Sequence, residues 1–227
     1  MKKYLVLGVL FVLPIVAYVF FASGVNNFGK LPTLRESVLA EVSLLDENGS
    51  EVSFKDHISI LGFLGDDLEH KKTNAFNLNQ KIYKRFNGFT DFQFVMVLPE
   101  NTKSQVAALK QELSPLADIS NWKFVFLPTD QVADMYNKLN IPGALNDDVY
   151  IDRVYIIDRD GSLRGRSDDE DMGLLFGYDA TSVAEINNKM VDDVKIILAE
   201  YRLALKKNNK SGTSQRDSYL KKLQHEK

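Results

Sequence analysis

Three short, nearly continuous apolar runs are the feature that most restricts how this chain can fold. They comprise residues 58–64, 92–98 and 122–127, and polar or turn-forming residues bound each of them. Apolar runs of this length suit strands that are covered on both faces, as in a parallel sheet between two layers of helices. The pattern therefore predicts a buried central sheet.

Helical periodicity occupies the segments between and after these runs. Residues 68–86, 103–113 and 181–205 repeat apolar side chains at steps of three and four, the spacing of amphipathic helices. The predicted buried positions are Ala75, Leu78, Ile82, Phe86, Val106, Leu109, Leu113, Ile186, Met190, Val194, Ile197, Leu198 and Tyr201. A further short helix is expected at 130–139, so strands and helices alternate as in the α/β class.

A hairpin is expected at each end of this alternation. At the first end, residues 38–45 and 51–54 are predicted strands, and the turn contains Asn48-Gly49. At the second, residues 153–158 and 162–166 flank Asp160-Gly161. We therefore predict a central mixed sheet flanked by helices, with an added N-terminal hairpin.

The N-terminal segment predicts a transmembrane helix. Residues 4–22 contain no charged residue and follow Lys2 and Lys3, a length that roughly spans the hydrocarbon core of a bilayer. A cleaved signal peptide is the alternative, but its apolar region is shorter and ends at small residues, whereas Phe20 is large. We expect a retained signal anchor with a periplasmic domain, because Lys2 and Lys3 favour the cytoplasmic side.

These features divide the chain of 227 residues into four parts. We predict an anchor at 1–24, a tether at 25–35, one domain at 36–205 and a charged, solvated tail at 206–227. The partners expected from this organisation are the membrane, through residues 4–22, and another envelope protein. The net charge of −3 gives no reason to expect binding to nucleic acid.

The chain contains no cysteine. Nucleophilic thiols, thiol redox pairs, thiolate metal sites and a lipid-modified cysteine anchor are therefore excluded. The domain must also be stable without disulfides in a compartment that would permit them.

Three features resemble the SCO/SenC branch of the thioredoxin superfamily. They are the anchor followed by a hairpin, the strand and turn at 154–161 (Val-Tyr-Ile-Ile-Asp-Arg-Asp-Gly), and Gly177-Tyr178 followed by a long helix. The resemblance covers about residues 36–205 and implies a thioredoxin-like fold. It also implies copper binding through a Cys-x-x-x-Cys after the strand at 58–64 and a histidine before the strand at 153–158.

This chain departs from that family at each copper ligand. Alignment on Phe63 places Asp66 and His70 at the two cysteine positions, and Tyr150, Ile151 and Asp152 lie near the position of the histidine. The proline that precedes this strand in the superfamily is also absent, since Pro142 lies too far upstream. Copper delivery and thiol reduction are therefore not expected.

Asp66, His70 and Asp152 form a candidate site for a divalent metal. Loops at the carboxyl ends of parallel strands converge, and two carboxylates with an imidazole suit zinc better than Cu(I). The alternative, which we favour, is that Asp66 or Asp67 caps the helix beginning near Leu68 and that His70 is exposed in its first turn.

Two other clusters have similar alternatives. The acidic run 168–171, together with Asp147 and Asp148, could bind calcium or a basic partner, but we expect a solvated loop because calcium-loop spacing is missing. The apolar residues 175–178 could line a partner groove, but we favour core packing of a returning strand. His57 is expected in an exposed turn, and His225 lies in the tail.

The resulting functional hypothesis is a binding or assembly module for an envelope protein, without thiol redox activity. Divalent-metal binding at Asp66 and His70 is the alternative. A metal-independent hydrolase or transferase is a third class, although the sequence contains no Gly-x-Ser-x-Gly elbow, phosphate-binding glycine loop or metalloprotease helix motif.

Overall fold

The computed structural model describes residues 2–22 and 29–204. Helix α1 (Lys2–Ala22) covers the uncharged N-terminal run, and its side chains Leu10, Phe11 and Ile15 are exposed. Among the described residues, no helix has the length and apolarity required to cross a membrane. The predicted tail at 206–227, with His225, lies outside the described residues.

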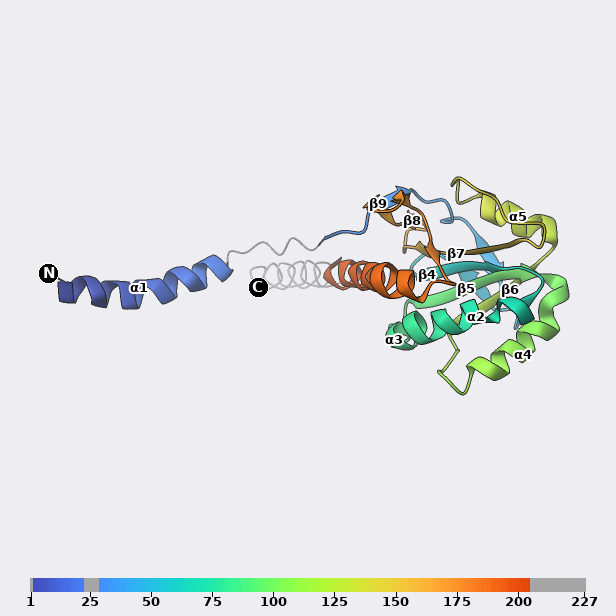
Figure 1. The fold of residues 1–227 in the computed structure, drawn as a ribbon, viewed down its shortest axis with the longest axis horizontal. Helices are drawn as coiled ribbons and strands as arrows, with labels where there is room; N and C mark the ends of the chain where they lie inside the picture. The colour runs from blue at the N-terminus through green and yellow to red at the C-terminus, as the bar shows by residue number, and fades with distance from the viewer. Residues whose placement is uncertain (1, 23–28, 205–227) are drawn as a thin grey trace, which may run out of the picture.

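A seven-stranded mixed sheet forms the centre of the domain (Figure 1). Its strand order is β1-β8-β7-β4-β5-β6, and β11 pairs with β7 beyond this path. The bounds are β1 (Thr33–Arg35), β4 (Ile58–Leu64), β5 (Phe92–Pro99), β6 (Trp122–Leu127), β7 (Tyr150–Ile157), β8 (Leu163–Arg164) and β11 (Tyr178–Asp179). The neighbours β4, β5 and β6 are parallel, whereas β7 is antiparallel to β4, β8 and β11.

The three apolar runs form neighbouring strands as predicted, with β4 and β5 inside the sheet, whereas β6 is an edge strand and is only partly buried. Every residue of β4 and β5 is buried. Side chains alternate between two cores, so that Ile60 and Phe94 face one side of the sheet while Leu61 and Val95 face the other.

Helices cover both faces of the sheet, and Figure 1 shows α2 and α4 on one side and α5 on the other. The helical bounds are α2 (Leu68–Leu78), η1 (Asn79–Tyr83), α3 (Lys84–Phe86), η2 (Glu100–Thr102), α4 (Lys103–Leu113), α5 (Thr129–Asn137), α6 (Val183–Glu185) and η3 (Ile186–Met190). Residues 191–204 continue η3 as an α-helix. We call residues 183–204 the C-terminal helix.

The predicted helices are confirmed, with two π-helical turns that periodicity did not indicate. One is η1, which interrupts the predicted helix 68–86, and the other is η3 in the C-terminal helix. A π turn contains one residue more than an α turn, so a spacing of three and four residues between apolar side chains does not indicate it.

The N-terminal hairpin is confirmed, but its first strand is shorter than predicted. Strand β2 (Ser43–Leu45) pairs with β3 (Glu51–Ser53), whereas residues 36–41 form turns instead of the first half of the strand predicted at 38–45. The turns pack over the β7–β8 connection, where Leu39 donates its N–H to the Gly161 carbonyl at 2.9 Å. A Cβ added at Gly161 would lie 2.4 Å from the Ala40 nitrogen, so this approach requires glycine.

Two other segments differ from the sequence expectation. Strand β1 falls within the predicted tether at 25–35 and pairs with β8 at the sheet edge. The solvated loop predicted at 168–171 is correct for Asp168, Glu170 and Asp171, which are exposed. It is wrong for Asp169, which is buried in the hairpin that β9 (Arg166–Asp169) and β10 (Gly173–Leu175) form.

Candidate functional site

The site predicted from the resemblance lies where β4 ends and α2 begins. Gly65, Asp66 and Asp67 connect the two elements, and Gly65 has a positive φ of 71°. The side chain of Gln105 on α4 holds this connection, since it donates to the Asp66 carbonyl at 2.8 Å and accepts from the Leu68 N–H at 2.9 Å. The loop is therefore fixed by α4.

Asp67 is the N-cap of α2, so the capping alternative is confirmed at Asp67. Its carboxylate accepts from the backbone N–H of His70 at 3.5 Å and lies 2.9 Å from Nδ1 of the same residue. The His70 side chain is 82% exposed. The hydrogen bond that the His70 ring donates to the Asp67 carboxylate raises the pKa of His70 and lowers the pKa of Asp67.

Tyr150 lies beside Gly65 at the start of β7. Its hydroxyl accepts from Asn74 Nδ2 at 2.6 Å and donates to Asp152 Oδ1. The Lys71 ammonium lies 4.2 Å from the centre of the Tyr150 ring and 3.2 Å from Asp148 Oδ2. We call Lys71, Asn74, Asp148, Tyr150 and Asp152 the Tyr150 cluster.

The contact between Gly65 and the Tyr150 cluster closes this end of the sheet. A Cβ added at Gly65 would lie 2.7 Å from Tyr150 Cβ and 2.9 Å from the Asp148 carbonyl. Burial, together with the bond to Asp152, raises the pKa of Tyr150. The phenol therefore stays protonated at neutral pH and acts as a hydrogen-bonding spacer.

A strained turn presents Tyr150 to Gly65. Val149 has a positive φ of 50°, which is unfavourable for a β-branched residue. Asn146 stabilises the turn, because its carbonyl accepts from the Val149 N–H at 2.9 Å and its side chain accepts from the Tyr150 N–H at 2.8 Å. Strain of this kind persists only where the surroundings enforce it.

The candidate metal residues have separate roles in the structure. Asp152 belongs to the Tyr150 cluster, His70 bonds to Asp67, and the Asp66 backbone carbonyl bonds to Gln105. Within residues 2–22 and 29–204, no group of three or more histidine or acidic side chains is arranged to hold a metal ion. The arrangement supplies oriented hydrogen bonds, and the cysteine-free sequence supplies no thiol.

Sequence reasoning did not assign a role to Tyr150 or Gly65. The sequence places Tyr150 near the missing histidine, and the structure packs its side chain against Gly65. The available signal was Gly65, since a glycine directly after a buried strand often marks a close approach of another chain segment.

The residues 175–178 pack into the core, as we favoured. Tyr178 is fully buried in β11, and its hydroxyl donates to Asp193 Oδ2 at 2.7 Å. Arg166 holds the same carboxylate at 2.7 Å. These bonds connect the base of the β9–β10 hairpin to the C-terminal helix.

The tip of the β9–β10 hairpin is a second candidate surface. Met172 and Leu174 are 58% and 51% exposed, although both are apolar. The C-terminal helix supports the hairpin, because Lys189 Nζ lies 2.8 Å from carboxylate oxygens of both Asp169 and Asp171. A rigid support with exposed apolar side chains is suited to contact with another protein.

Comparison with solved structures shows the fold. BsSco, described as a member of the Sco family of cytochrome c oxidase assembly proteins, is 16% identical over 74% of this chain and 98% of its own, with a TM-score of 0.51. A SCO1/SenC family lipoprotein from Bacillus anthracis is 16% identical, with coverage of 76% and 96% and a TM-score of 0.50. A putative electron transport protein from Aquifex aeolicus is 17% identical, with coverage of 73% and 98% and a TM-score of 0.50.

The domain therefore has the thioredoxin-like fold that the sequence resemblance implied, and it resembles the Sco/SenC proteins without carrying a cysteine. No family profile and no curated protein sequence matches the chain.

Proposed function

We propose that this protein is a membrane-anchored, extracytoplasmic binding or assembly module for another envelope protein, and that it has no thiol redox activity. The observation that carries the proposal is the Tyr150 cluster packed against Gly65 in a chain without cysteine. The positions aligned with the family's cysteines carry Asp66 and His70, and the hydrogen-bonded Tyr150 packs beside them against Gly65. A thioredoxin-like scaffold without a reactive group still offers binding surfaces.

The anchor in this proposal is the segment 4–22. The sequence there has no charged residue, and the apolar side chains described in α1 are largely exposed. Apolar side chains in this number need an apolar environment, which a bilayer supplies. The positive charges of Lys2 and Lys3 favour a cytoplasmic N-terminus and a domain outside the cytoplasm.

The partner-binding surface in this proposal is the tip of the β9–β10 hairpin. It combines Met172 and Leu174 with the acidic side chains of Asp168 and Glu170, which are also exposed. An apolar centre with a charged border is a common arrangement at protein interfaces. BsSco is described as an assembly protein, and an assembly role for this chain is consistent with that likeness.

In-cell crosslinking of the full-length protein, followed by membrane solubilisation and co-purification, tests this function. We expect the protein in the membrane fraction after alkaline extraction, together with a defined envelope partner that stays bound after treatment with a chelator. Recovery of the full-length protein without any stoichiometric partner would contradict the binding-module proposal.

Metal analysis of the same sample tests the alternative site at Asp66, His70 and Asp152. Zinc or copper near one equivalent that is lost in both Asp66→Ala and His70→Ala would favour metal binding. An unchanged trace amount in all three proteins would support the metal-independent proposal.

A further inference from the structure

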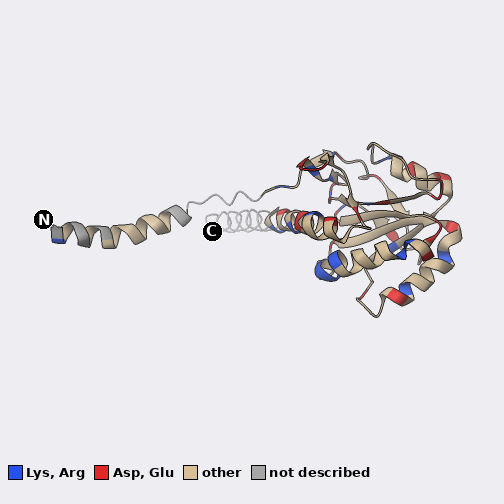
Figure 2. Cartoon of the chain, in the orientation of Figure 1, with Lys and Arg blue, Asp and Glu red and all other residues tan. Residues whose placement is uncertain are grey.

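The tip of the β9–β10 hairpin joins exposed apolar and exposed acidic side chains. Met172 and Leu174 are the apolar ones, and Asp168, Glu170 and Asp171 are the acidic ones. Figure 2 shows red acidic residues on this hairpin above the C-terminal helix, and blue basic residues on α3 below it. This composition restricts the class of partner that the hairpin tip can bind.

A β-bulge places an apolar side chain beside a carboxylate. Two residues of β9, Ser167 and Asp168, lie opposite the single residue Leu174 of β10, because the pairing of the two strands shifts there. The neighbours Asp169 and Leu175 are buried, so Asp168 and Leu174 share the exposed face of the hairpin. Bulges of this kind direct side chains at specific positions and are common at functional sites.

The negative charge of the hairpin tip is only partly neutralised from within the domain. Lys189 contacts it from the C-terminal helix, and its Nζ lies 2.8 Å from carboxylate oxygens of Asp169 and Asp171. The side chains of Asp168 and Glu170 make no hydrogen bond or ion pair within the described parts of the chain. These two carboxylates are therefore available to basic groups of a partner.

The backbone of the hairpin tip is also accessible. A Cβ added at Gly173 would meet no atom within 4 Å, so no other segment of the described chain packs over this position. The flanking Met172 is unbranched and adapts its shape to the group that packs on it. The aliphatic stem of a lysine or arginine can pack on such a surface while its charged end reaches a neighbouring carboxylate.

We infer that the envelope partner binds the hairpin tip through a segment in which lysine or arginine residues lie beside apolar residues. Its apolar side chains pack on Met172 and Leu174, and its positive charges lie against Asp168 and Glu170. Complementary charge across an interface speeds association and selects against wrong partners. This inference deepens the proposed function and rests on its assignment of the hairpin tip as the partner-binding surface.

The charge of the hairpin tip disfavours two other classes of partner. An anionic membrane surface and a nucleic acid are both negatively charged, so Asp168 and Glu170 would repel them. A second copy of this chain is the competing occupant, because Lys84 and Arg85 on α3 are exposed and basic. The experiment below therefore includes a readout for self-association.

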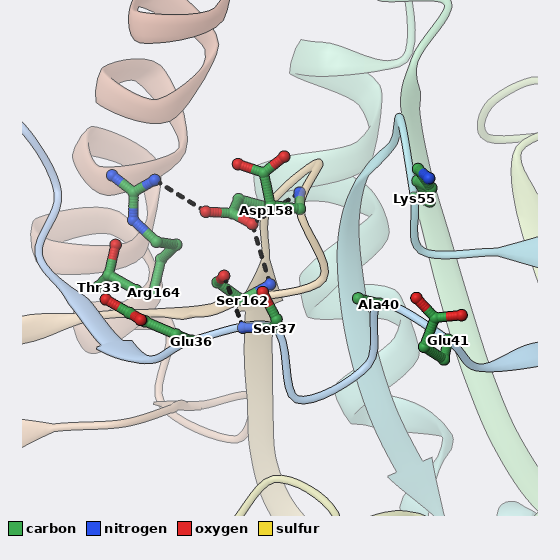
Figure 3. Close-up of a pocket in the computed structure, with 10 residues that line it drawn as sticks. Thr33, Glu36, Ser37, Ala40, Glu41, Lys55, Asp158, Ser162 and Arg164 are labelled. Carbon is green, nitrogen blue, oxygen red and sulfur yellow. Dashed lines mark hydrogen bonds and ion pairs between the residues drawn. The ribbon is translucent and has the colours of Figure 1, made fainter.

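The polar cavity in Figure 3, of about 510 Å³, is less suited to a basic and apolar segment. Glu36 and Glu41 line it together with Lys55 and Arg164, so charges of both signs meet there. Among the described residues that line the cavity, Ala40 is the only apolar one. The cavity thus lacks the apolar contact that the hairpin tip supplies.

A photoreactive peptide of defined composition tests the inference on the full-length protein. The protein is reconstituted in phosphatidylcholine nanodiscs, and the probe is a short peptide of alternating lysine and leucine with one photoreactive residue. Two control peptides carry glutamate in place of every lysine, or serine in place of every leucine. Mass spectrometry maps the adducts, and a photoreactive amino acid at Met172 reports self-association in detergent without peptide.

We expect adducts of the lysine–leucine peptide at residues 167–174 and few adducts of either control peptide. Asp168→Asn combined with Glu170→Gln should weaken binding by up to about fivefold per charge at low ionic strength. Added salt should also weaken binding. The matched control is Asp134→Asn combined with Asp147→Asn, two exposed acidic residues outside the hairpin, which should leave binding unchanged.

A second pair of variants tests the apolar contribution. Leu174→Ser should weaken binding of the lysine–leucine peptide by about tenfold, because the partner's leucine loses an apolar side chain on which to pack. Leu45→Ser is the matched control, since Leu45 is also apolar and exposed but lies on β2. Equal losses in the two variants would refute binding at the hairpin tip.

Equal adduct yields from the lysine–leucine and glutamate–leucine peptides would overturn the inference. Adducts that map outside the hairpin, including those in the cavity of Figure 3, would also overturn it. So would a crosslink from Met172 to α3 of a second copy. If the peptide fails to bind while a stoichiometric envelope partner co-purifies from cells, only the basic segment is rejected and the proposed function stands.

Discussion

At the residue scale, the packing of Tyr150 against Gly65 determines the structure at the C-terminal end of β4. The glycine permits a positive φ and leaves the space that the tyrosine fills, and the tyrosine hydroxyl joins Asn74 to Asp152. Neither residue is reactive at neutral pH. Their packing converts the end of the strand into a fixed surface.

Gly65→Ala should destabilise the domain by about 2–4 kcal/mol, since it adds a left-handed backbone penalty to a clash with Tyr150 and Asp148. Gly49→Ala is the matched control, because Gly49 has a φ of 77° but no atom within 4 Å of the added Cβ. Its cost should be about 1 kcal/mol. Urea unfolding of both variants measures the difference, and equal costs would contradict the close packing.

Two buried asparagines on one helix offer a second test. Asn79 is fully buried, and its side-chain amide has no hydrogen-bond partner among the described residues, whereas Asn74 bonds to Tyr150. Asn79→Leu should therefore raise the free energy of unfolding by about 1 kcal/mol, and Asn74→Leu should lower it by about the same amount. A loss of stability in Asn79→Leu would show that its amide has a partner.

The capping role of the Asp66-Asp67 pair could be predicted from the sequence, because an aspartate directly before an apolar periodic segment is a preferred N-cap residue. The Tyr150 cluster did not. It joins residues more than seventy positions apart, from Asn74 to Tyr150, and no local pattern encodes such a contact.

At the element scale, the β9–β10 hairpin depends on one lysine of the C-terminal helix. Lys189 bonds to Asp169 and Asp171, and the bond to Lys189 lowers the pKa of Asp169. A lowered pKa contributes stability above the unfolded value of 3.8, and this contribution is lost as the pH falls through the folded value.

Lys189→Met should therefore loosen the hairpin and make its opening occur at higher pH during acid titration. Hydrogen exchange should increase at residues 169–175 and remain unchanged in β4. Lys195→Met is the control, since Lys195 bonds to Asp192 on its own helix at 2.8 Å. A hairpin that exchanges equally in both variants would refute the role of Lys189.

The long strands and helices could be predicted because their sequence signal extends over seven or more residues, as a continuous apolar run in β4 and as helical periodicity in α4. Strands β1 and β10 have three residues each, which is too short for alternation to be visible. The burial of Asp169 within the acidic run at 168–171 was not predicted, because its partner Lys189 lies twenty residues away.

At the scale of the whole molecule, the core contains tyrosines that must remain protonated. Burial raises the pKa of Tyr150, Tyr155 and Tyr178 above the ordinary value of 10.0. The folded state therefore holds these protons more tightly than the unfolded chain, and the resulting stability is present below pH 10 and is lost as the pH rises further.

We expect the urea midpoint to fall steeply above about pH 10. The late part of the tyrosine absorbance titration should coincide with the loss of tertiary structure. Complete ionisation of all tyrosines in a protein that stays folded would contradict the burial of these three side chains.

The thioredoxin-like arrangement of the whole domain was predictable from element order, whereas the contact between Leu31 and the C-terminal helix was not. Leu31, which the sequence assigned to a tether, donates its N–H to Glu200 near the end of the C-terminal helix.

Site-specific photo-crosslinking in cells tests the central claim, that this cysteine-free domain binds an envelope partner, most directly. A photoreactive amino acid is placed at Leu174 on the hairpin, and at Leu45 as a control that is also apolar and is 62% exposed on β2. We predict one defined adduct from Leu174, unaffected by chelators, and none from Leu45. The absence of an adduct at Leu174, or the same adducts at both positions, would contradict the account.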